Sequence, residues 1–128
     1  MNEFEKFLRE INRAFSEGDT QYLLENVTDD FCWFIVGEKT VSGKTEFSEA
    51  LEQMRQLPPM KIEIDNIIME GNSASVEGKV TGKNKNGQKK HFGFCDLYRV
   101  TNPAAPKISE MTSFVIDLSK HKLYKESC

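Results

Sequence analysis

Residues 73–100, which read SASVEGKVTGKNKNGQKKHFGFCDLYRV, contain the strongest structural signal in this chain. Asn86-Gly87 is the dipeptide that most strongly favours a tight β-hairpin turn. Before the turn, residues 73–83 alternate small apolar and polar side chains, and after it residues 88–100 carry a dense aromatic and aliphatic run. The stretch therefore predicts two long antiparallel strands joined at residues 84–87.

Two further strands are predicted to extend this hairpin into a sheet. Residues 60–70 read as a strand that turns at Gly71-Asn72, and residues 107–118 read as a strand after a proline-containing loop. Long antiparallel strands coil strongly, so we expect the sheet to bend. The second half of the chain is thus predicted to be β-structure throughout.

The first half of the chain is predicted to be mainly helical. Apolar side chains recur at helical spacing from Phe4 to Phe15, and Gly18 favours the end of that helix. A second, short helix is expected after Asp19, and a third between Ser42 and the Pro58-Pro59 pair, which stops it. Between these two helices, residues 31–36 (FCWFIV) read as a strand buried on both faces.

The predicted order of elements is α-α-β-α-β-β-β-β, which places the chain in the α+β class. Because the sheet has one face to bury, we expect three N-terminal helices to cover a curved antiparallel sheet. One domain is predicted at residues 1–118, followed by a polar tail at residues 119–128. An apolar cavity is expected between the helices and the sheet.

Composition excludes several classes of protein. Hydrophobic residues make up 38% of the chain and charged residues 29%, which is too apolar for a disordered chain and too charged for a membrane protein. The net charge of −3 disfavours a nucleic-acid partner. The start of the chain lacks the pattern of a signal peptide, which predicts a cytoplasmic protein. Two separated histidines and three cysteines show no zinc-site spacing, so neither a metal nor another cofactor is predicted.

Four segments resemble the nuclear transport factor 2-like superfamily, which includes ketosteroid isomerases and SnoaL-like polyketide cyclases. They are Phe15-Ser16-Glu17-Gly18-Asp19, Thr28-Asp29-Asp30-Phe31, Val41-Ser42-Gly43-Lys44, and Cys95-Asp96-Leu97-Tyr98-Arg99-Val100 leading to Lys107-Ile108. They span almost the whole chain, so residues 1–118 look like a single SnoaL-like domain. The resemblance implies that the curved sheet is cone-shaped, as in a cystatin-like roll. It also implies a homodimer formed through the outer face of the sheet. It says less about activity, because this fold hosts isomerases, cyclases, hydrolases and binding proteins.

The catalytic residues of ketosteroid isomerases carry over to this chain only in part. The position of that family's general base looks like Phe34, and the position of its oxyanion-hole tyrosine looks like Ile11. The oxyanion-hole aspartate has a counterpart in Asp96. Limonene epoxide hydrolases use an Asp-Arg-Asp set in which the arginine lies two residues before an aspartate. In this chain Arg99 follows Asp96 instead, so the resemblance does not support that mechanism. The resemblance thus implies a pocket with one of the three isomerase groups.

Asp96 is the candidate catalytic residue, since it interrupts an aromatic run in a strand expected at the centre of the sheet. A carboxylate among aromatic groups should have a raised pKa and could donate a proton. Strand alternation places Phe94, Asp96 and Tyr98 on one face. Glu110 and Asp117 should point to opposite faces, so that one of them could reach the cavity. The predicted ligand-binding residues are Ile11, Phe15, Phe34, Phe94, Tyr98, Met111, Ser113 and Val115.

Three functions remain open from the sequence. The favoured one is a non-catalytic or weakly specialised pocket protein that binds a small, flat apolar molecule with one polar handle. The second is an isomerase or cyclase in which Asp96 is the acid or base and Tyr98 orients the substrate. The third is an interaction module whose basic hairpin contacts an anionic partner through Lys79, Lys83, Lys85, Lys89, Lys90 and His91. No membrane partner is predicted.

Overall fold

The computed structural model describes residues 1–119, and over that range it contains three helices and six strands. The polar tail predicted at residues 119–128 lies almost entirely outside this range. The helices are α1 (Glu3–Glu17), α2 (Thr20–Glu25) and α3 (Gly43–Arg55). The strands are β1 (Val27–Ile35), β2 (Lys39–Ser42), β3 (Lys61–Glu70), β4 (Ser73–Lys83), β5 (Lys89–Val100) and β6 (Ile108–Asp117).

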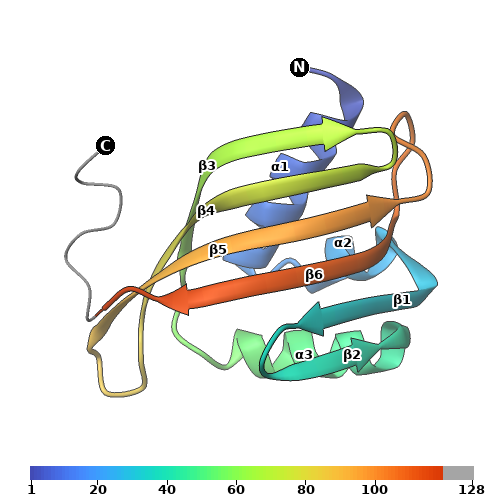
Figure 1. Ribbon diagram of the computed structural model, residues 1–128. Helices are drawn as coiled ribbons and strands as arrows, with labels where there is room; N and C mark the ends of the chain where they lie inside the picture. The colour runs from blue at the N-terminus through green and yellow to red at the C-terminus, as the bar shows by residue number, and fades with distance from the viewer. Residues whose placement is uncertain (120–128) are drawn as a thin grey trace.

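The strands form one curved sheet in the order β2-β1-β6-β5-β4-β3, and the helices cover one of its faces (Figure 1). The predicted α+β class and the three covering helices are confirmed. Two details differ from the prediction. A short edge strand, β2, follows β1, and β1 pairs with β6 in parallel, whereas the other strand pairs are antiparallel.

Helix α1 forms where local sequence and burial agree. The Asn2 side chain accepts a hydrogen bond from the Glu5 N–H at 2.8 Å, and Gly18 ends the helix in the left-handed conformation with φ 72°. One face of the helix is buried against the sheet through Phe4, Phe7, Leu8, Ile11, Asn12 and Ala14. Asn12 is the one polar side chain in this buried set within the described part of the helix.

A bulge interrupts the pairing of β3 with β4 next to Gly78 of β4. The pairing of β3 with β4 shifts between Ile64 and Asn66, which is a bulge that bends the strand. Gly78 lies opposite Ile64, and the ring of Phe94 from β5 packs directly over it. A Cβ atom at this position would overlap the carbonyl oxygen of Glu63 and approach Phe94 Cε1 to 2.9 Å. Only glycine fits this contact without displacing the backbone.

Within residues 1–119, the opposite face of the sheet carries no helix (Figure 1). Four large apolar side chains are exposed on the strands there, at fractions between 44% and 64%: Ile68, Leu97, Phe114 and Ile116. We call these four residues the outer apolar patch.

Candidate functional site

A cavity of about 540 Å³ lies between the helices and the inner face of the sheet. Its wall is mostly apolar, with aromatic side chains from α1, β1 and β5. The residues that line it are Asn12, Phe15, Trp33, Ile35, Glu38, Met54, Leu57, Met60, Ile62, Val80, Phe92, Phe94, Asp96, Met111, Ser113, Val115 and Asp117. A cavity of this size and lining is typical of a site for a small organic molecule.

Asp96 is the buried carboxylate of this cavity. It lies on β5, an interior strand, and only 7% of its surface is exposed. Burial raises the pKa of Asp96 to about 6, and the hydroxyl groups of Ser113 and Tyr98 partly oppose that rise by stabilising the charged form. Asp96 therefore titrates close to neutral pH, as the sequence suggested for a carboxylate among aromatic groups.

Ser113 is held beside Asp96 by the sheet and by Trp33. Asp96 and Ser113 are direct cross-strand neighbours on β5 and β6. The indole Nε1 of Trp33 donates a hydrogen bond to Ser113 Oγ at 2.8 Å. Because that bond occupies an acceptor position of the hydroxyl, the hydroxyl hydrogen is free to point toward Asp96. The polar end of the cavity is thus an ordered group of three side chains.

Tyr98 lies in the interior next to this group. Burial raises the pKa of its phenol well above the ordinary value, and the negative charge of Asp96 adds to the rise. The Asn12 side chain lowers the pKa of the phenol. Its Nδ2 donates a hydrogen bond to the Leu8 carbonyl at 2.8 Å. Within the described residues, Tyr98 Oη is a buried polar atom without a hydrogen-bond partner. A buried phenol of this kind stays protonated, and its hydroxyl group lies near enough to Asp96 to stabilise the charged carboxylate.

Six of the nine site residues proposed from the sequence line the cavity: Phe15, Phe94, Asp96, Met111, Ser113 and Val115. The other three do not. Ile11 is fully buried in the core between helix and sheet, and Tyr98 lies in the interior without reaching the wall. Phe34 points away from the cavity, because strand alternation turns its neighbours Trp33 and Ile35 inward.

Several cavity residues were not proposed from the sequence. Asn12 stands one position beyond Ile11 on α1, and Trp33 and Ile35 flank Phe34 on β1. Glu38 comes from the turn after β1, where no pattern pointed to it. The remaining ones are apolar side chains from the end of α3 and from neighbouring strands: Met54, Leu57, Met60, Ile62, Val80 and Phe92.

The two carboxylates of the last strand separate as expected. Asp117 lines the cavity and is exposed at its rim. Glu110 lies on the other face, where Arg99 Nε is 4.0 Å from its carboxylate. Asp117 therefore belongs to the candidate site and Glu110 does not.

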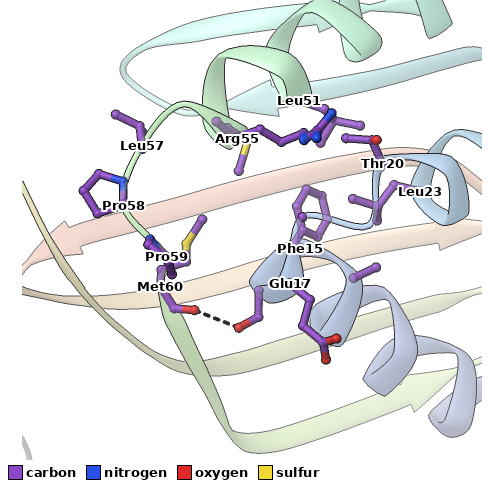
Figure 2. A pocket seen from close by; sticks show the side chains of 14 residues that line it. Phe15, Glu17, Thr20, Leu23, Leu51, Arg55, Leu57, Pro58, Pro59 and Met60 are labelled. Carbon is purple, nitrogen blue, oxygen red and sulfur yellow. Dashed lines mark hydrogen bonds between the residues drawn. The ribbon is translucent and has the colours of Figure 1, made fainter.

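A smaller pocket of about 220 Å³ lies between the end of α1 and the segment after α3 (Figure 2). Ser16 Oγ donates a hydrogen bond to the Met60 carbonyl at 2.8 Å across this space. Its charged side chains, Glu17 and Arg55, are on the surface, and it contains no buried ionisable group. Burial, charge and aromatic lining thus favour the larger cavity as the functional site.

The basic hairpin is less uniform than its sequence suggests. Lys79 forms an ion pair with Asp65 at 3.4 Å, so its charge is partly neutralised. The lysines nearer the turn, Lys83 and Lys89, border a shallow surface depression beside Pro58 and Pro59.

Over residues 1–119, no group of His, Cys, Asp and Glu is arranged to hold a metal ion. No helix in that range is long and apolar enough to span a membrane.

Comparison with known proteins agrees with this architecture. An NTF2-like protein of unknown function from Cytophaga hutchinsonii is 28% identical, with a TM-score of 0.67 over 88% of this chain and 99% of that one. An LEH-like epoxide hydrolase from M. tuberculosis is 16% identical, with a TM-score of 0.76 over 89% of this chain and 83% of that one.

A ketosteroid isomerase-like protein from Catenulispora acidiphila, in complex with trimethylamine, is 13% identical. Its TM-score is 0.74 over 84% of this chain and 82% of that one. At such identities the epoxide hydrolase and the Catenulispora protein show a shared fold alone. A search of curated protein sequences finds no match. The SnoaL-like domain family matches residues 8–111, which is most of the chain, and the chain therefore belongs to that family.

Proposed function

We propose that this protein binds a small, flat, apolar molecule whose one polar group is directed at Asp96 and Ser113. The observation that carries the proposal is the aromatic-walled cavity of about 540 Å³ with a single buried carboxylate. Asp96 and Ser113 can accept and donate hydrogen bonds, while Trp33 and Phe94 offer flat apolar surfaces. The Catenulispora protein of the same fold binds trimethylamine, which supports a small-molecule site in this fold.

Proton transfer is the second candidate function, in an isomerase or cyclase. The observation that favours it is the pKa of Asp96 at about 6, which lets the group give or take a proton near neutral pH. The cavity-facing positions of β1, however, are Trp33 and Ile35, and neither side chain can act as a general acid or base. Turnover that Asp96→Asn abolishes while ligand binding is retained would favour the enzyme over the binding protein.

Filling the cavity should weaken ligand binding without unfolding the protein. Trp33 is the one tryptophan of the chain and lies in the cavity wall, so its fluorescence reports on an added ligand. We expect 2-indanol, a flat bicyclic alcohol, to change that fluorescence with saturation. Val80→Phe should weaken the binding by about tenfold or more, because the larger side chain projects into the space the ligand needs.

The matched control is Val36→Phe, which makes the same substitution at an exposed position outside the cavity. It should bind 2-indanol like the parent protein. Equal binding by Val80→Phe and Val36→Phe would place the ligand elsewhere and contradict the proposed function.

The outer apolar patch supports a second part of the proposal, a two-fold homodimer through the uncovered face of the sheet. Exposed Leu97 and Phe114 lie on neighbouring strands, and a second copy would remove both from water. We expect light scattering to give twice the chain mass of 14.7 kDa at micromolar concentration. The double variant Leu97→Glu with Phe114→Glu should give a single chain mass, and Val36→Glu should not. A parent protein that stays at 14.7 kDa would contradict this assembly.

Location in the cytoplasm stays a prediction.

A further inference from the structure

The charges that line the cavity all have one sign. Asp96 lies within it, and Glu38 and Asp117 are exposed at its rim. Among the described residues that line the cavity, none is a lysine, an arginine or a histidine. A low-dielectric cavity bordered by one sign of charge concentrates ligands of the opposite sign and repels those of the same sign.

The wall next to Asp96 adds a second, independent feature. Trp33 and Phe94 line the same cavity, and Phe15 packs against Trp33 with ring centroids 5.6 Å apart. Aromatic faces attract cations through the ring quadrupole, most strongly for tryptophan, and this attraction grows when the cation is removed from water. A carboxylate beside aromatic rings is a combination that suits an ammonium group better than a neutral hydroxyl group.

We propose that the ligand carries a basic amine, bound as an ammonium group by the Asp96 carboxylate, with its apolar body between Trp33 and Phe94. This inference rests on the proposed function and narrows it to one ligand class. Ser113 Oγ, held by Trp33, keeps the Asp96 carboxylate oriented toward the bound ammonium. Glu38 and Asp117 contribute at longer range, by favouring the entry of cations over anions.

The ionisation of Asp96 is compatible with this role. With a pKa of about 6, most Asp96 side chains are charged at neutral pH even in the empty cavity. An ammonium group next to the carboxylate stabilises the charged form further. The polar groups that act on Asp96 from the neighbouring positions are Ser113 and Tyr98, and both of them stabilise its charged form.

Three probes with the same bicyclic body separate charge from shape: 2-aminoindane, 2-indanol and indane-2-carboxylate. Each would be titrated into the 128-residue chain at neutral pH and low salt, with Trp33 fluorescence as the signal. We expect 2-aminoindane to bind about tenfold or more tightly than 2-indanol, since hydrogen bonds between charged groups are about twice as strong as neutral ones. Indane-2-carboxylate should bind most weakly of the three.

The variant Asp96→Asn should remove most of the preference for 2-aminoindane over 2-indanol, because asparagine has nearly the same volume as aspartate and no charge. Glu49→Gln is the matched control, because it removes one negative charge from an exposed site on α3 outside the cavity. It should leave the preference unchanged.

Two failures are distinguishable. Binding of 2-indanol at least as tight as that of 2-aminoindane would overturn the amine inference and leave the apolar pocket standing. A preference for the amine that survives Asp96→Asn would also overturn it, because the anchor would then be another group. No binding of any of the three probes would overturn both this inference and the proposed function.

Discussion

Asp96→Asn is expected to make the protein more stable at pH 8, by about 3 kcal/mol of unfolding free energy. The pKa of Asp96 is raised from an ordinary 3.8 to about 6 because the side chain is buried, and the ionised form is therefore disfavoured in the folded state. An amide of the same shape lacks that cost. For a domain of this size the gain corresponds to a rise in melting temperature of about 10 °C.

The stability difference between the variant and the parent protein should depend on pH. A difference that came from packing alone would stay the same at every pH. Above pH 6 the folded protein carries the full cost of the charged Asp96. As the pH falls from 6 toward 3.8, folded Asp96 takes up a proton before the unfolded chain does, and the cost is relieved. The two proteins should therefore converge in stability near pH 4.

Calorimetric melting curves from pH 4 to pH 8 would measure the difference. Glu49→Gln serves as the control, since it removes an exposed carboxylate on the same fold. An Asp96→Asn variant that melts below the parent protein at pH 8 would show that the hydrogen bonds of the carboxylate outweigh its burial. The same result would count against Asp96 as a group poised for ligand binding at the expense of stability.

Gly78→Ala is expected to be strongly destabilising, by about 3–5 kcal/mol, which is the range of severe backbone and packing conflicts. The added methyl group would overlap the Glu63 carbonyl oxygen and press on the Phe94 ring at 2.9 Å. Neither obstacle is the end of a flexible chain, since one is backbone and the other is a buried ring that lines the cavity. The bulge on β3 or the ring itself must therefore move.

Gly82→Ala is the matched control on the same strand. Its added carbon would meet Met60 Cβ at 3.5 Å, which is an ordinary contact. That variant should lose little stability, or gain some through reduced freedom of the unfolded chain. Urea unfolding of both variants would test the contrast, and a Gly78→Ala protein as stable as Gly82→Ala would mean that β3 does not approach β4 as closely as described.

The β-half of the fold could be predicted from local sequence, because Asn86-Gly87 fixes the hairpin and the strands beside it are long. The structure starts β5 at Lys89 and ends it at Val100, within one residue of the predicted range. The edge strand β2 could not be predicted in this way, since four residues are too short to show a period. The parallel pairing of β1 with β6 joins segments about eighty residues apart, and no local pattern encodes such a pairing.

The candidate site could be predicted on strands whose two faces carry different side chains, because the inward-facing positions can then be identified. On β5, Asp96 interrupts an aromatic run. Because it shares a face of the strand with Phe94 and Tyr98, its side chain is expected to point inward. On β1 the six apolar residues from Phe31 to Val36 look alike on both faces, so the choice between Phe34 and Trp33 had no local signal. The structure starts β1 at Val27, so that three polar residues, Thr28 to Asp30, belong to the strand before the apolar run, which the sequence pattern did not show. Glu38 lines the cavity from the turn after β1, a placement that no local pattern indicates.

A crystal structure of the protein grown with 2-indanol tests the account most directly. We expect the bicyclic ring between Trp33 and Phe94, with its hydroxyl oxygen within hydrogen-bond distance of Asp96 and Ser113. An empty or collapsed cavity, with the alcohol bound elsewhere or with the Asp96 side chain turned away from the space, would contradict it.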